Sequence, residues 1–242
     1  SIDTEMKLTG EDHVYLDVTH KDPEETKKHF PNIYQKCLSI GIDITKEYIP
    51  VCPASHYLCG GIKVDENART TINHLYAAGE CTRTGLHGGN RLASNSLLEA
   101  IVYAEAAAQH SLPLIDNINW CDEIPEWNDE GTTLNEEMVL ITQSEKEVNQ
   151  IMQAYVGIVR SNLRLKRAFD RLELIYKETE SLFQRSVVSK EICELRNIVN
   201  TAYLVIKSAM QRKESRGLHY TIDYPKKNEH ISLYDVEELK KL

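Results

Sequence analysis

The 242-residue sequence predicts an α+β fold in which a glycine-rich half of strands and loops precedes an antiparallel three-helix bundle. The first observation is that residues 56–99 hold six of the eleven glycines, between short apolar runs. The second is that three long segments after residue 144 repeat apolar residues at the period of amphipathic helices. We therefore expect the chemistry in the first half and a helical support in the second.

The first fifty residues predict two strands and two short helices. The segment 13–20, HVYLDVTH, alternates apolar and polar side chains, which predicts a half-buried strand. Asp22 and Pro23 suit the N-cap and the first position of a helix, and Pro31 begins a second one. Pro50 and Pro53 favour an extended crossing segment or edge strand over residues 48–53.

The glycine-rich stretch predicts two strands and the start of a helix. The strands are expected at 62–64 and 75–78, the second one buried and built mainly of small residues. Ser94 or Asn95 then caps a helix that runs to about residue 109. The residues expected to face inward on this helix are Leu97, Leu98, Ile101, Val102 and Ala106.

A linker and a capping signal precede the predicted bundle. Residues 111–143 have no clean period, and Trp120 and Trp127 are expected to anchor them against the rest of the chain. The capping box that begins at Ser144 predicts the start of the first bundle helix.

The C-terminal segment contains an arginine cluster and a polar tail. We expect Arg160, Arg212 and Arg216 to brace the bundle, in preference to lining the entrance for an acidic substrate. Residues 218–222 predict extended structure, and residues 226–242 form either a mobile tail or a terminal helix.

Composition excludes several classes of function. A net charge of -9 disfavours a nucleic acid partner, because phosphate binding needs an excess of clustered Lys and Arg. No apolar run has the length of a membrane span, and the N-terminus does not resemble a signal peptide. The six cysteines contain no CxxC pair, so we expect no metal site and a reduced, cytoplasmic protein.

The glycine-rich stretch carries residues suited to a cofactor and a substrate. Glu80 follows a predicted strand, where a carboxylate can receive the hydroxyls of a nucleotide or ribityl chain. The helix start near Ser96 favours negative charge, as on a reduced flavin, and the glycines before it allow the close approach of a flat ring. His56 and Arg91 can together hold two carboxylates. Taken singly, each residue also has an ordinary structural explanation, and for His87 a hydrogen bond within its own loop is favoured.

Five segments of the chain resemble a known family. They are HYLCGG, LYAAGE, TGLHGGNRLASNSLLE, YVGIVR and RKESRGLHYTIDYP, and the third is the most specific. Together they are similar to the C-terminal part of the L-aspartate oxidases, within the flavoprotein family of succinate dehydrogenase and fumarate reductase. The likeness extends over nearly the whole chain. It implies a two-domain FAD fold with an inserted capping domain, followed by a helical C-terminal domain.

The resemblance also implies an activity and partners. The family oxidises L-aspartate to iminoaspartate in NAD biosynthesis, by hydride transfer to N5 of FAD, with O2 or fumarate as the acceptor. An association with quinolinate synthase is implied as well.

The family's functional residues map onto this sequence one by one. His56 and Arg91 resemble the pair that holds the dicarboxylate substrate. The residues that resemble its FAD-binding positions are Glu80, Ser96, Leu97, Gly60 and Gly61.

Other parts of the family pattern have no counterpart in this chain. The dinucleotide-binding GxGxxG is absent, and the family's catalytic arginine is expected upstream of Ser1. The start SIDTEM indicates a cut within a longer protein. We therefore expect an inactive fragment without a catalytic residue, which binds FAD weakly or not at all. Its expected divisions are the end of a capping domain (1–50), the end of an FAD-binding domain (51–112), a linker (113–143), a helical domain (144–212) and an extended tail (213–242).

Two other functions stay open. The flavoprotein subunit of a succinate dehydrogenase or fumarate reductase would use the same dicarboxylate-binding residues, although HYLCGG and RLASNSLLE resemble the oxidase more closely. A non-catalytic helical interaction module would agree with the strong period at 144–211 but would leave the glycine-rich stretch unexplained.

Overall fold

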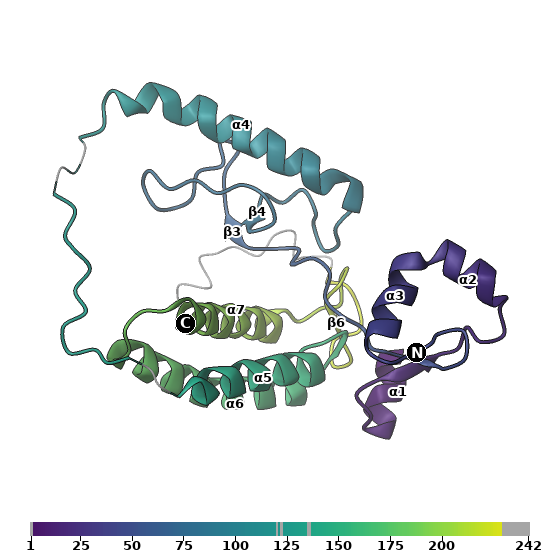
Figure 1. Cartoon of the computed structure of the whole chain (residues 1–242). Helices are drawn as coiled ribbons and strands as arrows, with labels where there is room; N and C mark the ends of the chain where they lie inside the picture. The colour runs from purple at the N-terminus through teal and green to yellow at the C-terminus, as the bar shows by residue number, and fades with distance from the viewer. Residues whose placement is uncertain (1, 120, 122, 135–136, 229–242) are drawn as a thin grey trace. The chain divides into compact units, whose positions relative to one another are not determined.

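The computed structural model describes residues 2–119, 121, 123–134 and 137–228, and it contains helices and short strands (Figure 1). The mixed helical and strand content that the sequence predicts is confirmed. The chain divides into two compact units, residues 1–56 and residues 57–242, each with its own set of internal contacts.

The first unit combines three helices with a two-stranded sheet. Its helices are α1 (Ile2–Thr9), α2 (Pro23–His29) and α3 (Pro31–Ser39), and strand β1 (Val14–Leu16) pairs antiparallel with β2 (Ile49–Val51). As predicted, Asp22 caps α2, because its side chain accepts a hydrogen bond of 2.9 Å from the Glu25 amide. Both predicted strands are confirmed, although Leu16 is exposed rather than half-buried.

The second unit begins with the glycine-rich stretch. Strand β3 (Ile62–Lys63) pairs parallel with β4 (Thr82–Arg83), and the 3-10 turn η1 (Ala93–Asn95) leads into helix α4 (Ser96–Ile115). The strand predicted at 62–64 and the position of the predicted helix start are confirmed. The predicted cap is wrong, because Ser94 lies inside η1 and Asn95 forms no side-chain capping hydrogen bond. The strand predicted at 75–78 is wrong. Those residues close a tight turn onto the residues just before them, through an isolated bridge of Tyr76 with Arg69, and the chain pairs as a strand only at β4.

Helix α4 differs from the prediction in length and in exposure. It continues past residue 109 and through Pro113 to Ile115. The expectation that four of its apolar residues face inward is wrong, since they are 56–71% exposed: Leu97, Leu98, Ile101 and Val102. The period identifies an apolar face, but no layer covers that face within the part of the chain that the structure describes.

The second half of this unit is built from three long helices and a small parallel sheet. Helices α5 (Met138–Tyr155), α6 (Asn162–Arg185) and α7 (Lys190–Gln211) pack against one another (Figure 1). Their buried apolar residues form one core that includes Val148, Leu172 and Ile206. Strand β5 (Val159–Arg160) pairs with β6 (Tyr220–Thr221), which confirms the extended structure predicted near 220.

The predicted start of the first long helix is wrong. Helix α5 begins at Met138, and Ser144 lies inside it, where its hydroxyl donates to the Leu140 carbonyl at 2.8 Å. The serine matches a capping box, but the helix extends to residues before it, one of which packs in the core. This residue is Ile141, with 3% of its surface exposed.

The linker also departs from expectation. Trp127 is 69% exposed, so the prediction that it anchors the linker is wrong. Trp120 and the residues from 229 to 242 of the tail lie outside the described residues.

Candidate functional site

Arg91 is oriented by two contacts. Its guanidinium carbon lies 4.0 Å from the centroid of the Tyr57 ring, and its Nε donates to the Ser96 hydroxyl at 2.6 Å. These contacts occupy one face of the guanidinium and one of its N–H groups. Among the described residues no carboxylate pairs with Arg91, so its terminal nitrogens are available to the carboxylate of a ligand.

The loop before Arg91 is tied to α4 through a buried pair. His87 Nε2 lies 2.8 Å from Glu99 Oε2, and these side chains are 10% and 2% exposed. The Thr84 hydroxyl donates to the other oxygen of Glu99. The His87 contact is an ion-pair approach without hydrogen-bond alignment, and Nδ1 has no hydrogen bond within the described ranges. The predicted partner within the loop is therefore wrong, because the partner belongs to the first turn of α4.

The two glycines after Cys59 differ in their surroundings: Gly61 is packed against the backbone of β4, and Gly60 has open space beside it. Gly61 has a φ of +144°, and a Cβ at this position would lie 2.1 Å from the Cys81 carbonyl oxygen. That oxygen accepts a hydrogen bond of 2.9 Å from the Ile62 amide, so Gly61 allows β3 to meet β4. A Cβ on Gly60 would meet nothing within 4 Å. The backbone of Gly60 is thus open to a ligand.

Glu80 is hydrogen-bonded to the backbone just before this glycine pair. Its Oε1 accepts a hydrogen bond of 3.1 Å from the Leu58 amide, and the residue is exposed. Its second oxygen has no partner within the described residues and can accept a hydroxyl. His56 is the last residue of the first unit, so the structure describes it and Arg91 in separate units.

Ser96 and Leu97 begin helix α4. The preceding residue, Asn95, forms no side-chain capping hydrogen bond, and the Ser96 amide donates to the Ala93 carbonyl of the 3-10 turn. The Ser96 side chain is engaged by Arg91, whereas Leu97 is 71% exposed.

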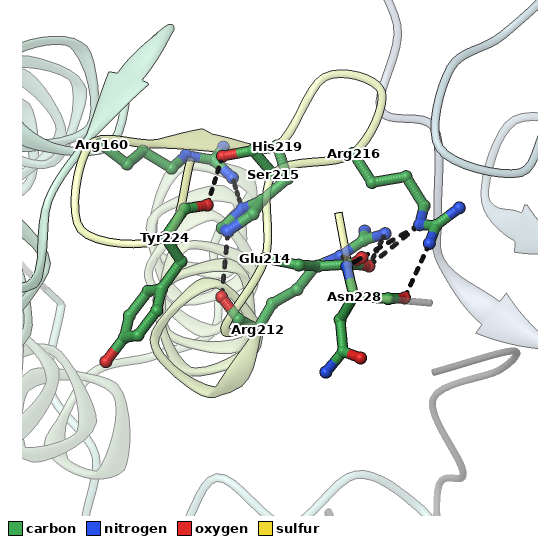
Figure 2. A network of polar contacts seen from close by, with 8 residues as sticks. All are labelled: Arg160, Arg212, Glu214, Ser215, Arg216, His219, Tyr224 and Asn228. Atoms are coloured by element: carbon green, nitrogen blue, oxygen red, sulfur yellow. Dashed lines mark hydrogen bonds and ion pairs between the residues drawn. The ribbon is translucent and has the colours of Figure 1, made fainter. Parts of the chain in front are cut away.

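A second polar cluster lies in the C-terminal segment (Figure 2). Glu214 is only 1% exposed and accepts hydrogen bonds of 2.9–3.2 Å from the side chains of Arg212 and Arg216 and from the Asn228 amide. Burial raises the pKa of Glu214, but the hydrogen bonds from Arg216, the Asn228 amide and Arg212 outweigh it and lower the pKa to about 2.

His219 holds the other side of this cluster. Arg160 Nη1 donates to His219 Nδ1 at 2.8 Å, and His219 Nε2 donates to the Arg212 carbonyl at 3.2 Å (Figure 2). This pairing requires a neutral imidazole. Burial, followed by the positive charges of Arg160 and Arg212, lowers the pKa of His219 to about 4. Glu214 and His219 of the C-terminal segment thus bind the arginine side chains. This arrangement favours a bracing role for the arginines over a role in lining the entrance for a substrate.

Three residues near Arg91 were not predicted from the sequence: Tyr57, Thr84 and Glu99. A signal existed for Glu99, which is a lone acid inside the apolar run SLLEAIVYA. Nothing in the sequence marked Tyr57 or Thr84, since their contacts depend on how separate loops fold together.

No group of His, Cys, Asp and Glu side chains in the described ranges has the arrangement of a metal site. All six cysteines are free. None of the helices in those ranges combines the length and the hydropathy that a membrane span requires.

Two protein families match separate parts of the chain. Residues 1–97 match the family of the FAD binding domain, and residues 145–236 match that of the fumarate reductase flavoprotein C-terminus.

Curated relatives match nearly the whole chain. The L-aspartate oxidase of Pseudomonas aeruginosa is 50% identical over 225 residues, which cover 93% of this chain and 42% of that protein. The chloroplastic L-aspartate oxidase 2-b of Nicotiana tabacum is 46% identical over 241 residues, which cover 93% of this chain and 37% of that protein. The chain therefore spans about two fifths of the length of these relatives.

Solved structures share the fold. A quinol-fumarate reductase with menaquinol molecules is similar with a TM-score of 0.73 at 26% identity, over 94% of this chain and 44% of that one. Sdh1 of Mycobacterium smegmatis, in complex with UQ1, is similar with a TM-score of 0.69 at 28% identity, over 89% of this chain and 38% of that one.

Proposed function

Because the chain belongs to the flavoprotein family of the L-aspartate oxidases, succinate dehydrogenases and fumarate reductases, we propose that it is the C-terminal part of an L-aspartate oxidase. The reaction of the complete enzyme is the oxidation of L-aspartate to iminoaspartate in NAD biosynthesis. The observation that carries this proposal is Arg91, a guanidinium oriented by Tyr57 and Ser96 and without a carboxylate partner among the described residues.

The glycine-rich stretch fits an FAD. A Cβ on Gly60 or Gly88 would meet nothing within 4 Å, so a flat ring can approach their backbone. Glu80 offers a carboxylate oxygen to a hydroxyl of the cofactor, and Ser96 and Leu97 present the start of α4 to its negative side. Bound FAD supplies the acceptor for the hydride, at its N5 atom.

Arg91 and His56 hold the dicarboxylate in this proposal. Arg91 binds one carboxylate through two parallel N–H groups, and the Tyr57 ring fixes the orientation of the guanidinium plane. His56 donates a hydrogen bond to the second carboxylate. With both ends fixed, the Cα–H of the substrate has one orientation, which lowers the entropic part of the barrier to hydride transfer.

The chain alone is proposed to be inactive and to bind FAD weakly or not at all. The family's catalytic arginine would lie upstream of Ser1, together with the dinucleotide-binding half. The division into domains at residues 50, 112, 143 and 212 and the antiparallel direction of the three helices are part of this proposal. Helix α5 begins before the third of these limits.

A second candidate is the flavoprotein subunit of a succinate dehydrogenase or fumarate reductase. The match of residues 145–236 and the solved structures above favour it. The oxidase is preferred because the oxidases are 46–50% identical to this chain, against 26–28% for the two solved structures.

The acceptor is proposed to be O2 or fumarate, and quinolinate synthase a partner of the enzyme. Six free cysteines favour a reducing compartment such as the cytoplasm, although the tobacco relative is chloroplastic.

The test compares the complete enzyme that contains this chain with the chain by itself. With L-aspartate the complete enzyme should lose its flavin absorbance without air and release hydrogen peroxide in air, and succinate should do neither. Bleaching by succinate alone would replace the oxidase with the second candidate. Stoichiometric FAD on the isolated chain would overturn its proposed incompleteness.

A matched pair of variants tests Arg91. Arg91→Lys should raise the KM for aspartate about tenfold or more, because a lysine cannot form the bidentate pair. Arg69→Lys changes an arginine that pairs with Asp65 in a surface turn and should leave the KM unchanged. Equal KM values for the two variants would remove Arg91 from the substrate site.

A further inference from the structure

We propose that a turn of the C-terminal segment, residues 214–219, positions Arg91 for its carboxylate ligand. The proposal rests on the proposed function for the identity of that ligand. The turn acts through the backbone of the loop that precedes Arg91, so its members are positioning residues rather than catalytic ones.

The turn meets the loop at two glycines. The Leu218 amide donates to the Gly89 carbonyl at 2.8 Å. Gly217 has a φ of +59°, and a Cβ at this position would lie 2.0 Å from the Gly89 oxygen and 2.8 Å from its Cα. A Cβ on Gly89 would in turn lie 3.4 Å from the Arg216 carbonyl oxygen. The backbones approach this closely because Gly217 carries no side chain, whereas a Cβ on Gly89 would lie at the limit of ordinary van der Waals contact.

A buried carboxylate and partly buried arginines fix the turn from its other side (Figure 2). Arg216 and His219 exchange backbone hydrogen bonds of 2.9 and 3.2 Å, which closes the turn. Glu214 binds the side chains of Arg212 and Arg216. Arg160 on β5 holds the His219 ring. These contacts fix the turn that the loop before Arg91 meets.

The loop is also fixed at a point before the glycines. His87 contacts Glu99 of α4, and the Asn90 amide donates back to the His87 carbonyl at 3.2 Å. Between His87 and Arg91 lies the pair Gly88-Gly89, which loses more conformational freedom on ordering than other residues. The hydrogen bond from Leu218 supplies the second fixed point. This hydrogen bond thereby fixes the direction of the backbone that leads from Gly89 to Arg91.

The effect on function follows from the geometry of carboxylate binding. Two parallel N–H groups bind a carboxylate well only when the guanidinium plane is held in place. Glu214, Arg212 and Arg216 therefore do more than brace the helices. They fix the turn, and the turn fixes the loop that precedes Arg91.

Two alanine variants disturb the contact between the turn and the loop to different degrees, and a third is the control. Gly217→Ala introduces the 2.0 Å clash, and Gly89→Ala introduces the milder contact at 3.4 Å. Gly131→Ala is the matched control, because its φ of +82° is also left-handed but its Cβ would meet nothing within 4 Å. Backbone strain alone would therefore affect Gly131→Ala as much as Gly217→Ala.

The first readout uses the 242-residue chain and does not depend on activity. NMR should show the side-chain protons of Arg91 shifted by the Tyr57 ring and slow hydrogen exchange at the Leu218 amide. Both signals should be lost in Gly217→Ala, weakened in Gly89→Ala and kept in Gly131→Ala. Unchanged Arg91 signals in Gly89→Ala and in a folded Gly217→Ala would overturn the proposal. If Gly217→Ala does not fold, Gly89→Ala decides alone.

The second readout is the kinetics of the complete enzyme. The KM for aspartate should rise about tenfold in Gly217→Ala and about threefold in Gly89→Ala, while kcat changes less than about twofold. Losses of kcat that follow the melting temperature, with constant KM, would indicate a purely structural contact and refute the positioning role. If the wild-type enzyme does not oxidise aspartate, the proposed function fails, and the NMR comparison still decides whether the turn positions Arg91.

Discussion

His87 and Glu99 form a buried pair with 2.8 Å between nitrogen and oxygen, and this pair fastens the loop before Arg91 to the first turn of α4. The His87 ring also stands edge-on to the Tyr57 ring, with 5.6 Å between centroids. The face of Tyr57 carries the Arg91 guanidinium. One acid on α4 therefore supports, through one histidine, both the loop and the ring that orient Arg91.

Loss of Glu99 should destabilise the start of α4. Glu99→Ala leaves the buried His87 ring and the Thr84 hydroxyl without their partner, and we expect a loss of about 2 kcal/mol, the order found when a buried polar group loses its partner. Hydrogen exchange of the α4 amides measures this local stability. Glu105→Ala, at an exposed position of the same helix, should change it by less than about 0.5 kcal/mol. Similar losses in both variants would contradict a special role for Glu99.

Gly61 and Gly60 should respond differently to the same substitution. Gly61→Ala combines a strained φ with a Cβ 2.1 Å from the Cys81 oxygen, and it should weaken the pairing of β3 with β4. We expect a cost of about 2 kcal/mol, or about thirtyfold faster hydrogen exchange at the Ile62 amide. Gly60→Ala has open space at its Cβ and should leave that exchange rate unchanged. An unaffected Ile62 amide in Gly61→Ala would rule out the close approach.

Acid should weaken the C-terminal cluster through His219. Its folded pKa of about 4 lies below the usual 6.5, so folding disfavours the protonated ring. The folded state is not penalised above pH 6.5, where the ring is neutral in both states. Between pH 6.5 and 4 only the unfolded chain binds the proton, so the free energy of unfolding decreases as the pH falls. The free energy of unfolding should fall by about 1.4 kcal/mol per pH unit inside that window.

Urea unfolding at a series of pH values measures this slope. His219→Gln should remove it, whereas His20→Gln, at an exposed position, should retain it. An NMR titration midpoint of His219 near 6.5 in the folded chain would refute the prediction.

Two serines should show which residues cap helices. Ser161 accepts a hydrogen bond of 3.2 Å from the Arg164 amide at the start of α6, so Ser161→Ala should cost about 1 kcal/mol. Ser144 lies inside α5, and Ser144→Ala should be neutral or stabilise the chain by a few tenths of a kcal/mol, because alanine has the higher helix propensity. Thermal unfolding compares the two, and a larger loss at Ser144 would place a helix start there.

Local signals predicted much of the fold correctly. Asp22 before Pro23 located α2, and the periods of α6 and α7 located both helices. These signals work because a cap or a helix face is defined by residues within one or two turns of each other.

The predictions were wrong where contacts between residues far apart in the sequence determine the structure. Ser144 has the neighbours of a cap, but Ile141 packs in the core and extends α5 past it. Leu97 belongs to an apolar face, but its exposure depends on what lies opposite. A period defines the face of a helix without defining its partner.

By itself, the sequence determined the helical second half, the glycine-rich loops, and Glu80, Arg91 and Ser96 as candidates for a binding site. Tertiary structure alone decided that Tyr57 lies against Arg91, that His87 pairs with Glu99 and that Gly217 meets Gly89. These are side-chain and backbone contacts between residues on different loops and helices. No local period or cap encodes such contacts, because they form only when the loops close on one another in space.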